Sequence, residues 1–372
     1  MGMGIKSEFS KLLSLADVKI DGSRPWDIRV QDERLYSRIL SQGSLGLGEA
    51  YMDRWWDCKS LDQFFDRILR AKLEQKIKPN LRMILRILQA KIFNLQPKSR
   101  AFNIGEKHYD TGNDLYRAML DKRMAYTCGY WKNAKTLDQA QEAKIDLVCK
   151  KLGLKPGQRV LDIGCGWGSF MKFAAQKYKV RCVGLTVSKE QKKLGEEMCK
   201  GLPVEFRLQD YREVNEKFDH IVSLGMFEHV GPKNYRGYME VVKRCLKDNG
   251  LFLLHTIGGN VSGSVGDPWF DKYIFPEGKL PSVRQIAEAS EGLFVMEDWH
   301  NFGADYDLTL MGWFKNFDKG WPKLKLSYNE RFYRMWKYYL LSCAGSFRSR
   351  RNQLWQIVFS KNGVVGRYNS IR

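Results

Sequence analysis

The fold is decided by the stretch Gln158-Arg-Val-Leu-Asp-Ile-Gly-Cys-Gly-Trp-Gly-Ser-Phe170. Its apolar run at 160–163 predicts a buried strand, and Asp162 lies near the end of that strand. Three glycines follow at alternate positions, and the apolar segment at 170–178 then has the character of a helix. A strand that ends in a glycine-rich turn before a helix presents bare backbone and a helix N-terminus to a ligand. We therefore expect a ligand site at this turn.

The spacing of the glycines separates this turn from the dinucleotide-binding fingerprint. Gly168 comes two residues after Gly166, one residue earlier than the third glycine of that fingerprint. About twenty residues further on, the chain reads Val183-Gly-Leu-Thr-Val-Ser188, without the acid that binds a ribose hydroxyl. Both departures disfavour NAD and FAD. The stretch resembles the first motif of S-adenosylmethionine-dependent methyltransferases, which implies S-adenosylmethionine as the ligand.

The composition sets the class of protein. A length of 372 residues predicts two domains, or one large domain with an extension. No apolar run reaches the roughly 18 residues that cross a bilayer, and the first residues lack the apolar block of a signal peptide. The 8 cysteines are scattered without a Cys-x-x-Cys pair, so we expect neither disulfides nor a metal site. These features predict a cytoplasmic protein.

The net charge of +20 indicates an anionic partner, either nucleic acid or an anionic membrane surface. The charge is concentrated between Arg67 and Arg100, a segment that contains ten basic residues and one acid, Glu74. Apolar residues recur at helical spacing over 81–95, so the segment reads as a basic amphipathic helix. Such a helix is typical of a membrane surface, and we favour this interpretation for the basic cluster. The alternative for the helix is packing on the catalytic domain with solvated charges.

From residue 159 the chain alternates strands and helices in the doubly wound manner. Strands are predicted at 159–163, 181–186, 204–208, 218–224 and 250–256, helices at 169–178, 188–200, 232–246, 282–290, 309–318 and 328–345, and an edge strand at 354–360. This pattern predicts an α/β fold, a doubly wound Rossmann-like sheet of the methyltransferase type with helical insertions, at 108–372. A smaller, mainly helical N-terminal domain is predicted at 1–95, and a linker at 96–107.

Further motifs make the resemblance specific. They are His108-Tyr-Asp110, Tyr126-Thr-Cys-Gly-Tyr-Trp131, Gly184-Leu-Thr-Val-Ser188, Gln209-Asp-Tyr-Arg212, Gly225-Met-Phe-Glu-His-Val-Gly231, Leu254-His-Thr-Ile-Gly258 and Phe302-Gly-Ala-Asp-Tyr-Asp307. With these motifs the chain resembles the cyclopropane-fatty-acyl-phospholipid synthases. The resemblance implies transfer of a methyl group from S-adenosylmethionine to a cis double bond of a phospholipid acyl chain. Loss of a proton from that methyl group then closes a three-membered ring.

The resemblance also implies nine cofactor-binding residues: Tyr126, Thr127, Asp162, Gly164, Gly166, Thr186, Gln191, Asp210 and Tyr211. Asp162 and the two glycines suit the methionine part, because a close backbone approach needs residues without side chains. Thr186 and Gln191 suit the ribose, while Asp210 and Tyr211 suit the adenine. Tyr126 and Thr127 are expected to close over the cofactor, although Thr127 and Gly129 flank Cys128 where the family has Ser and Ala. Simple packing is the alternative for Thr186 and Tyr211.

Glu228 and His255 each lie at the carboxyl end of a predicted parallel strand, where open α/β sheets place their ligands. A histidine in such a place is by itself more often structural, and we assign His220 and His300 to structure. The resemblance implies a bicarbonate site made by Cys128, Glu228, His255, Ile257 and Tyr306. All of these except Ile257 are expected to be catalytic.

Three other functions compete with this interpretation. S-adenosylmethionine-dependent N-methyltransferases of small amines share much of the fold, but amine methylation needs no base inside an apolar channel. Nucleic-acid methylation is favoured only by the charge, and no RNA-binding module accompanies it. A lipid-surface protein without catalysis is disfavoured by the intact glycine turn.

We therefore expect S-adenosylmethionine as the methyl donor, a bound bicarbonate ion and no metal. The expected substrate is unsaturated phospholipid in the membrane, and no nucleic acid is expected. The basic N-terminal region would hold the protein peripherally at the inner face of the cell membrane, on the cytoplasmic side. A homodimer is compatible with the sequence.

Overall fold

The computed structural model describes residues 2–73, 112–263 and 266–372. Over these residues the chain forms two compact units. The first combines the N-terminal region to residue 73 with 266–276 and 306–352, and the second combines 112–263, 277–305 and 353–372. The expected linker at 96–107 and the motif at 108–110 lie outside the described residues.

These units differ from the contiguous 1–95 and 108–372 domains expected from the sequence, because two late segments pack with the N-terminal region. Within the first unit, the Arg334 guanidinium donates hydrogen bonds to the Tyr51 carbonyl at 2.6 Å and to the Trp56 carbonyl at 3.1 Å. Gly345 lies close to the backbone of the helix Leu61–Arg70. A Cβ on Gly345 would lie only 2.6 Å from the Asp62 carbonyl oxygen. Such contacts join residues far apart in the sequence, so local patterns do not predict them.

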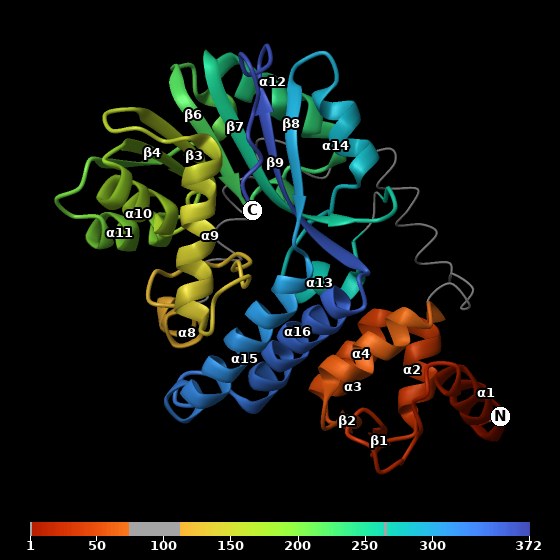
Figure 1. The fold of residues 1–372 in the computed structure, drawn as a ribbon. Helices are drawn as coiled ribbons and strands as arrows, with labels where there is room; N and C mark the ends of the chain where they lie inside the picture. Colours follow the sequence, from red (N-terminus) through yellow and green to blue (C-terminus); the bar gives the residue numbers. More distant parts are fainter. Residues whose placement is uncertain (1, 74–111, 264–265) are drawn as a thin grey trace. The chain divides into compact units, whose positions relative to one another are not determined.

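The first unit is mainly helical, as Figure 1 shows. Its elements are α1 (Gly2–Ser14), β1 (Ile28–Val30), α2 (Arg34–Gln42), α3 (Ser44–Met52), β2 (Trp56–Cys58), α4 (Leu61–Arg70), α13 (Pro268–Tyr273), α15 (Ala304–Leu324) and α16 (Glu330–Arg348). The β1 and β2 strands pair antiparallel. Buried aromatic side chains fill its core, among them Tyr51, Trp56, Phe64, Trp269 and Tyr338. Of the helices in the described ranges, none is long and apolar enough to span a bilayer.

The second unit is built on a seven-stranded sheet of order β5-β4-β3-β6-β7-β9-β8. Its strands are β3 (Arg159–Ile163), β4 (Arg181–Thr186), β5 (Val204–Leu208), β6 (Phe218–Leu224), β7 (Leu246–Gly259), β8 (Val295–Asn301) and β9 (Asn352–Ser360). The ladders from β5 to β7 are parallel, and β8 pairs antiparallel with β9. The five predicted strands from 159 to 256 and the doubly wound fold are confirmed.

The predicted edge position of the last strand is wrong. β9 lies between β7 and β8, so β8 forms the edge of the sheet. Every residue of β9 after Asn352 is buried, as both faces of an inner strand require, whereas β8 leaves Val295 and Met296 exposed.

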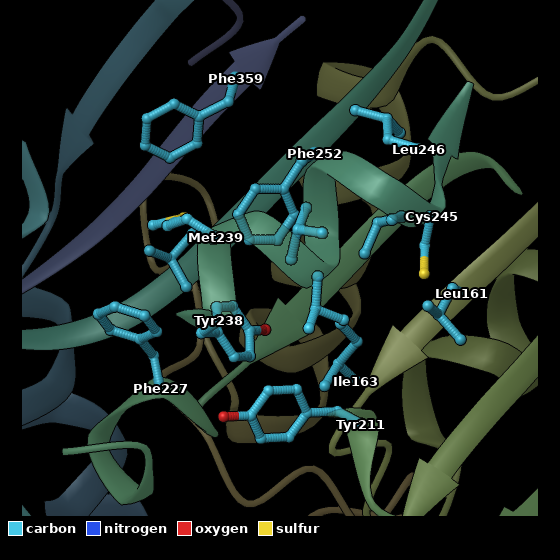
Figure 2. Packing of buried hydrophobic residues seen from close by; sticks show 14 of the residues in the cluster. Leu161, Ile163, Tyr211, Phe227, Tyr238, Met239, Cys245, Leu246, Phe252 and Phe359 are labelled. Atoms are coloured by element: carbon cyan, nitrogen blue, oxygen red, sulfur yellow. The ribbon is translucent and has the colours of Figure 1, made fainter. Parts of the chain in front are cut away.

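Helices cover both faces of this sheet. They are α9 (Leu137–Leu152), α10 (Ser169–Tyr178), α11 (Lys189–Met198), α12 (Tyr235–Cys245) and α14 (Val283–Ser290). The unit also contains α8 (Asn113–Met119) and the 3₁₀ turns η2 (Tyr211–Glu213), η3 (Phe227–His229) and η4 (Pro232–Asn234). Side chains alternate along β3: Leu161 and Ile163 join the core that α12 closes, whereas Val160 joins the core under α9 and α10. Figure 2 shows the α12 side, where Tyr238 and Phe252 pack between the layers.

Candidate active site

The glycine turn follows β3 as the sequence predicts, and its backbone needs glycine. Gly164, Gly166 and Gly168 all have positive φ, at 83°, 55° and 79°. A Cβ on Gly164 would lie 2.6 Å from Met226 Cβ, whereas a Cβ on Gly166 would meet no atom within 4 Å. The chain therefore leaves bare backbone facing open space at Gly166, which is the feature that a close ligand approach requires.

That open space is a cavity in the second unit. It measures about 180 Å³, more than ten times the volume that one water molecule requires. All nine predicted cofactor residues line it: Tyr126, Thr127, Asp162, Gly164, Gly166, Thr186, Gln191, Asp210 and Tyr211. The parallel strands β3, β4 and β5 bring most of them together, because their carboxyl ends meet at one edge of the sheet. Which parts of a ligand they contact stays a prediction.

Asp162 is the most strongly perturbed acid in the cavity. Its side chain is 2% exposed, and Oδ1 has no hydrogen-bond partner among the described residues. Burial raises the pKa of Asp162 to about 7, although the nearby Lys144 ammonium opposes the shift. A buried acceptor without a partner is costly unless a donor reaches it. The cavity therefore suits a ligand that brings an ammonium or another N–H group to Asp162.

The next two strand ends carry hydrogen bonds of their own. Thr186 Oγ1 donates to Gln191 Oε1 at 2.9 Å and accepts from the Ser188 amide at 3.1 Å. Ser188 in turn caps α11 by accepting from the Gln191 amide at 3.2 Å. This network holds the Thr186 and Gln191 side chains at the cavity wall before any ligand binds.

The cavity wall after β5 is shaped by a side chain that also packs in the core. Asp210 Oδ1 accepts from the Arg212 amide at 2.9 Å, and this bond starts the η2 turn. The Tyr211 ring lines the cavity and also packs 5.0 Å from the Tyr238 ring in the α12 core. Simple packing was the alternative to a cofactor role for Tyr211. The structure shows that Tyr211 packs in the core and also forms part of the cavity wall.

Two polar side chains of α9 were missed by the sequence reasoning. Gln141 and Lys144 are both buried and lie three residues apart, on one helix face. The Lys144 ammonium donates to Thr127 Oγ1 at 2.8 Å, and Gln141 Nε2 donates to the Thr127 carbonyl at 2.7 Å and more weakly to that of Ala125 at 3.4 Å. Burial lowers the pKa of Lys144 to about 8. Their signal in the sequence is the pair of polar residues inside the apolar stripe of a helix.

A second polar group lies at the ends of β6 and β7. Leu224 pairs with His255 in the ladder, and Glu228 follows in η3. Glu228 Oε1 accepts from the Ile257 amide at 2.7 Å. Ile257 was expected in the bicarbonate site, and in this structure its amide positions the Glu228 carboxyl group. Burial raises the pKa of Glu228 to about 7.

The free atoms of Glu228 and His255 are complementary. His255 Nδ1 lies 3.3 Å from the amide Nε2 of Gln356. When this amide donates to Nδ1, the imidazole proton is on Nε2. Burial, with smaller effects of Lys144 and Lys151, holds the pKa of His255 far below its usual range, so the ring is neutral. His255 Nε2 and Glu228 Oε2 are both buried without a hydrogen-bond partner in the described part of the chain. Glu228 Oε2 could accept a hydrogen bond from a ligand, and His255 Nε2 could donate one.

The remaining predicted site residues are separately placed. Cys128 is fully buried, and its thiol donates to the Gly129 carbonyl at 3.2 Å. Tyr306 belongs to the first unit, where its ring lies 4.5 Å from that of Phe347 and 5.8 Å from that of Trp313. The grouping of Tyr306 with Glu228 and His255 stays a prediction.

The other histidines have different surroundings. His220 Nδ1 accepts from the Leu251 amide at 3.2 Å, and His300 Nδ1 lies 3.1 Å from the Lys151 ammonium. These contacts agree with the structural roles assigned to His220 and His300. His229 lines the cavity, which the sequence reasoning did not predict, and burial lowers its pKa to about 4.

Comparisons with known proteins cover most of the chain. The family described as mycolic acid cyclopropane synthetase matches residues 96–357, a range that contains every residue lining the cavity. The cyclopropane-fatty-acyl-phospholipid synthase of Escherichia coli (strain K12) is 57% identical over 352 residues, which cover 95% of this chain and 92% of that protein.

Two solved structures show the fold. Mycolic acid cyclopropane synthase CmaA1, complexed with SAH and CTAB, is 33% identical with a TM-score of 0.65, over 72% of this chain and 99% of its own. Coclaurine N-methyltransferase, bound to N-methylheliamine and SAH, is 25% identical with a TM-score of 0.68, over 87% of this chain and 99% of its own.

Proposed function

The chain belongs to the mycolic acid cyclopropane synthetase family, and from this membership we propose that it is a cyclopropane-fatty-acyl-phospholipid synthase. In this proposal it transfers the methyl group of S-adenosylmethionine to cis double bonds of unsaturated phospholipid acyl chains. The observation that carries the proposal is the 57% identity to the Escherichia coli synthase across 95% of this chain.

The cavity fits S-adenosylmethionine on three independent features. The unpartnered Asp162 Oδ1 suits the α-ammonium group, and the bare backbone of Gly166 admits a close approach. The aromatic ring of Tyr211 suits the adenine. When bound, the sulfonium group supplies an electrophilic methyl to the alkene. The chain's own contribution is to orient that group and to exclude water, which the buried walls of the cavity support.

We also propose that a bound bicarbonate ion, rather than a side chain, removes the proton. Methyl transfer to an alkene leaves a carbocation whose adjacent C–H bonds are acidic, so a weak base suffices. An unpaired carboxylate beside apolar walls is disfavoured by desolvation, whereas a small anion held by hydrogen bonds is not. The unpartnered Glu228 Oε2 can accept the bicarbonate hydroxyl, and His255 Nε2–H can donate to another of its oxygens.

The alternative, N-methylation of small amines, has structural support but weaker sequence support. The TM-score to coclaurine N-methyltransferase is 0.68, slightly above the 0.65 to CmaA1. The sequence identity is 25%, compared with 57% for the Escherichia coli synthase, and so favours the synthase. Glu228 and His255, buried with complementary unpartnered atoms, would also have no role in amine methylation.

A phospholipid substrate places the enzyme at a membrane, and we propose that it is a peripheral protein of the cytoplasmic face. The basic stretch between Arg67 and Arg100 supports this proposal, although its first members are engaged within the chain. Arg67 pairs with Asp17 at 2.9 Å, and Arg70 pairs with Asp66 at 2.8 Å. The residues from 74 to 100 lie outside the described part of the structure, so their attraction to lipid rests on the sequence alone.

The test is an assay with S-adenosylmethionine and vesicles of a phospholipid that carries one cis double bond. We expect the fatty esters to gain the mass of one CH2 group without losing a ring-or-double-bond equivalent. Vesicles of saturated phospholipid are the control and should show no gain. Methylation of a small amine with no change in the lipid would instead favour the alternative function.

A further inference from the structure

The inference concerns the tip of the helical hairpin formed by α15 and α16. Ring contacts near both ends show that the two helices run antiparallel. Tyr306 packs 4.5 Å from Phe347 near one end, and Trp321 packs 4.9 Å from Tyr333 near the other. Figure 1 shows the helices side by side, in blue, with the short connection between them at the tip. This tip lies wholly within the first compact unit.

A stripe of lysines runs along α15 to the tip. Lys315, Lys319 and Lys323 are four residues apart, so they lie on one helix face, and all three are exposed. Like charges at this spacing destabilise a helix. Among the residues that the structure describes, none of the three forms an ion pair with a carboxylate. Asp318, on the same helix, instead accepts a hydrogen bond from the Tyr333 hydroxyl at 2.6 Å. The stripe therefore lacks an internal counter-charge, which points to an anionic partner.

The turn after the stripe exposes an apolar side chain. Leu326 is 85% exposed, more than any other large apolar residue in the described ranges except Val365. Lys325 precedes it and is exposed. Tyr328, two residues later, and Trp321, in the last turns of α15, are half-buried. The Tyr328 ring stacks on Phe332 at 4.4 Å. Tryptophan and tyrosine next to an exposed leucine and lysines are the residues that stabilise proteins at the boundary of headgroups and acyl chains.

We propose that this tip surface, made by Lys315, Lys319, Lys323, Lys325 and Leu326, docks on an anionic phospholipid bilayer. The proposal rests on the proposed function, which requires the enzyme to reach a bilayer substrate. The lysines bind the anionic headgroups, while Leu326 enters the apolar boundary beneath them. A nucleic acid would match the lysines only, because an exposed leucine gains little from a phosphate backbone. Lipid is therefore the partner that uses both features.

Charge reversal tests the electrostatic part. The double variant Lys319→Glu/Lys323→Glu is compared with Lys189→Glu/Lys193→Glu, which makes the same change of charge at the same spacing on exposed positions of α11. Binding of the whole protein to phosphatidylglycerol vesicles is measured by sedimentation. We expect the tip variant to lose about 100-fold or more, since each basic residue near an anionic surface counts severalfold. The α11 variant should stay within about threefold of the wild type.

Quenching tests the apolar part. An environment-sensitive fluorescent label is attached to Ser327→Cys, next to Leu326. Vesicles with brominated acyl chains should quench its fluorescence. The same label on Val365→Cys should not be quenched. Leu326→Ser should lower vesicle binding, whereas Val365→Ser should not. Thermal unfolding of each variant establishes that it is folded.

The outcomes separate this inference from the proposed function. Each variant is also assayed on a short-chain unsaturated phospholipid below its micellar concentration, where no bilayer exists. Normal turnover there, with lost vesicle binding, supports the inference. Vesicle binding of the tip variant at the wild-type level overturns it, whatever the activity. Tighter binding of the wild type to an RNA oligomer than to anionic vesicles also overturns it. Absence of methylation by the wild type on either lipid form counts against the proposed function alone.

Discussion

Lys144 Nζ donates a 2.8 Å hydrogen bond to Thr127 Oγ1, from a helix position that is fully buried. The bond ties α9 to the segment that carries Tyr126 and Thr127, two residues of the cavity wall. Because Gln141 also holds the Thr127 carbonyl, this segment is fixed by both its side chain and its backbone. A cavity wall that is held in advance loses less entropy when a ligand binds.

The first prediction follows from that bond. Lys144→Met keeps the side-chain length and removes the donor and its charge. We expect the affinity for S-adenosylmethionine to fall by about tenfold or more, since a hydrogen bond to a charged group contributes about 1.5–3 kcal/mol. Calorimetric titration measures it. Lys151→Met is the matched control, because Lys151 is also a buried lysine of α9 but contacts His300 and Asp298 and lies outside the cavity.

A pH readout accompanies this prediction. The pKa of Lys144 is lowered to about 8, from an ordinary value of 10.5. Between these values the unfolded chain binds the proton and the folded chain releases it, so the lysine adds stability as the pH rises through this window. Urea titrations should show that Lys144→Met lacks this increment. An unchanged cofactor affinity together with a lost increment would mean that Lys144 is only structural.

The second prediction concerns Gly166, whose φ of 55° strains any other residue. Gly166→Val would place a side chain in the cavity, and we expect cofactor affinity to fall by at least about 100-fold, or roughly 3 kcal/mol. Gly157→Val is the control. Gly157 has φ 83° and also faces open space, but it precedes β3 at the other end of the strand. A folded Gly166→Val protein with wild-type affinity would refute the assignment of the turn to the cofactor.

The sequence predicted those parts of the site that local patterns encode. A strand followed by alternating glycines predicts its own turn. The family resemblance implied that Asp162, Thr186 and Asp210 belong to one site, and the parallel strands explain why they share one edge of the sheet. The role of Lys144 was not predicted, because it depends on a hydrogen bond to Thr127, seventeen positions earlier. From the sequence alone, a lysine in a helix is expected to be exposed to solvent. The position of β9 escaped for a similar reason. An apolar run shows that a strand is buried, but its neighbours in the sheet depend on how the chain crosses over.

The domain boundary shows the same limit. The predicted helix at 328–345 is present as α16, and its period was readable. The segment against which α16 packs could not be predicted. Arg334 of α16 donates hydrogen bonds to the carbonyls of Tyr51 and Trp56, nearly three hundred residues earlier. Such pairings arise from the packing of the whole unit.

The third prediction tests the basic N-terminal stretch. Reversal of Lys72, Lys76, Arg82 and Arg86 to glutamate should weaken binding to anionic vesicles by orders of magnitude, because each charge contributes about 1 kcal/mol near the surface. Added salt should weaken wild-type binding in the same way, since screening shortens the attraction. Cofactor affinity, measured in parallel, should survive. Equal binding to neutral and anionic vesicles, insensitive to salt, would contradict the prediction.

The fourth prediction is a pH-dependent stability that Glu228 imposes. Burial raises its pKa from 4.5 to about 7, so the folded chain keeps a proton that the unfolded chain releases across this window. The contribution of Glu228 to stability is therefore full below pH 4.5 and is lost as the pH rises to 7, by on the order of 3 kcal/mol. Urea titrations of wild type and Glu228→Gln should diverge over this range. Parallel curves would show that the folded protein does not raise the pKa of this group.

The fifth prediction addresses the proton acceptor. Glu228→Ala leaves His255 Nε2–H in place but removes the carboxyl group that would accept the bicarbonate hydroxyl. We expect turnover to fall by roughly 10²–10⁴, the usual size of general-base catalysis, because the bicarbonate base would no longer be held. Cofactor affinity should stay nearly intact, because Glu228 does not line the cavity. Wild-type turnover should slow in carbonate-free buffer and recover when bicarbonate is restored.

The two manipulations are informative together, because carbonate depletion removes the proposed base and Glu228→Ala removes the group that orients it. If bicarbonate is the base, carbonate depletion should cost the Glu228→Ala variant much less than it costs the wild type, since the variant has already lost the means to orient the ion. His255→Ala should behave likewise, as it removes the donor to the other side of the ion. If Glu228 itself were the base, depletion would leave the wild type unaffected. A wild-type rate that ignores rigorous depletion would therefore return the role of base to Glu228 or His255.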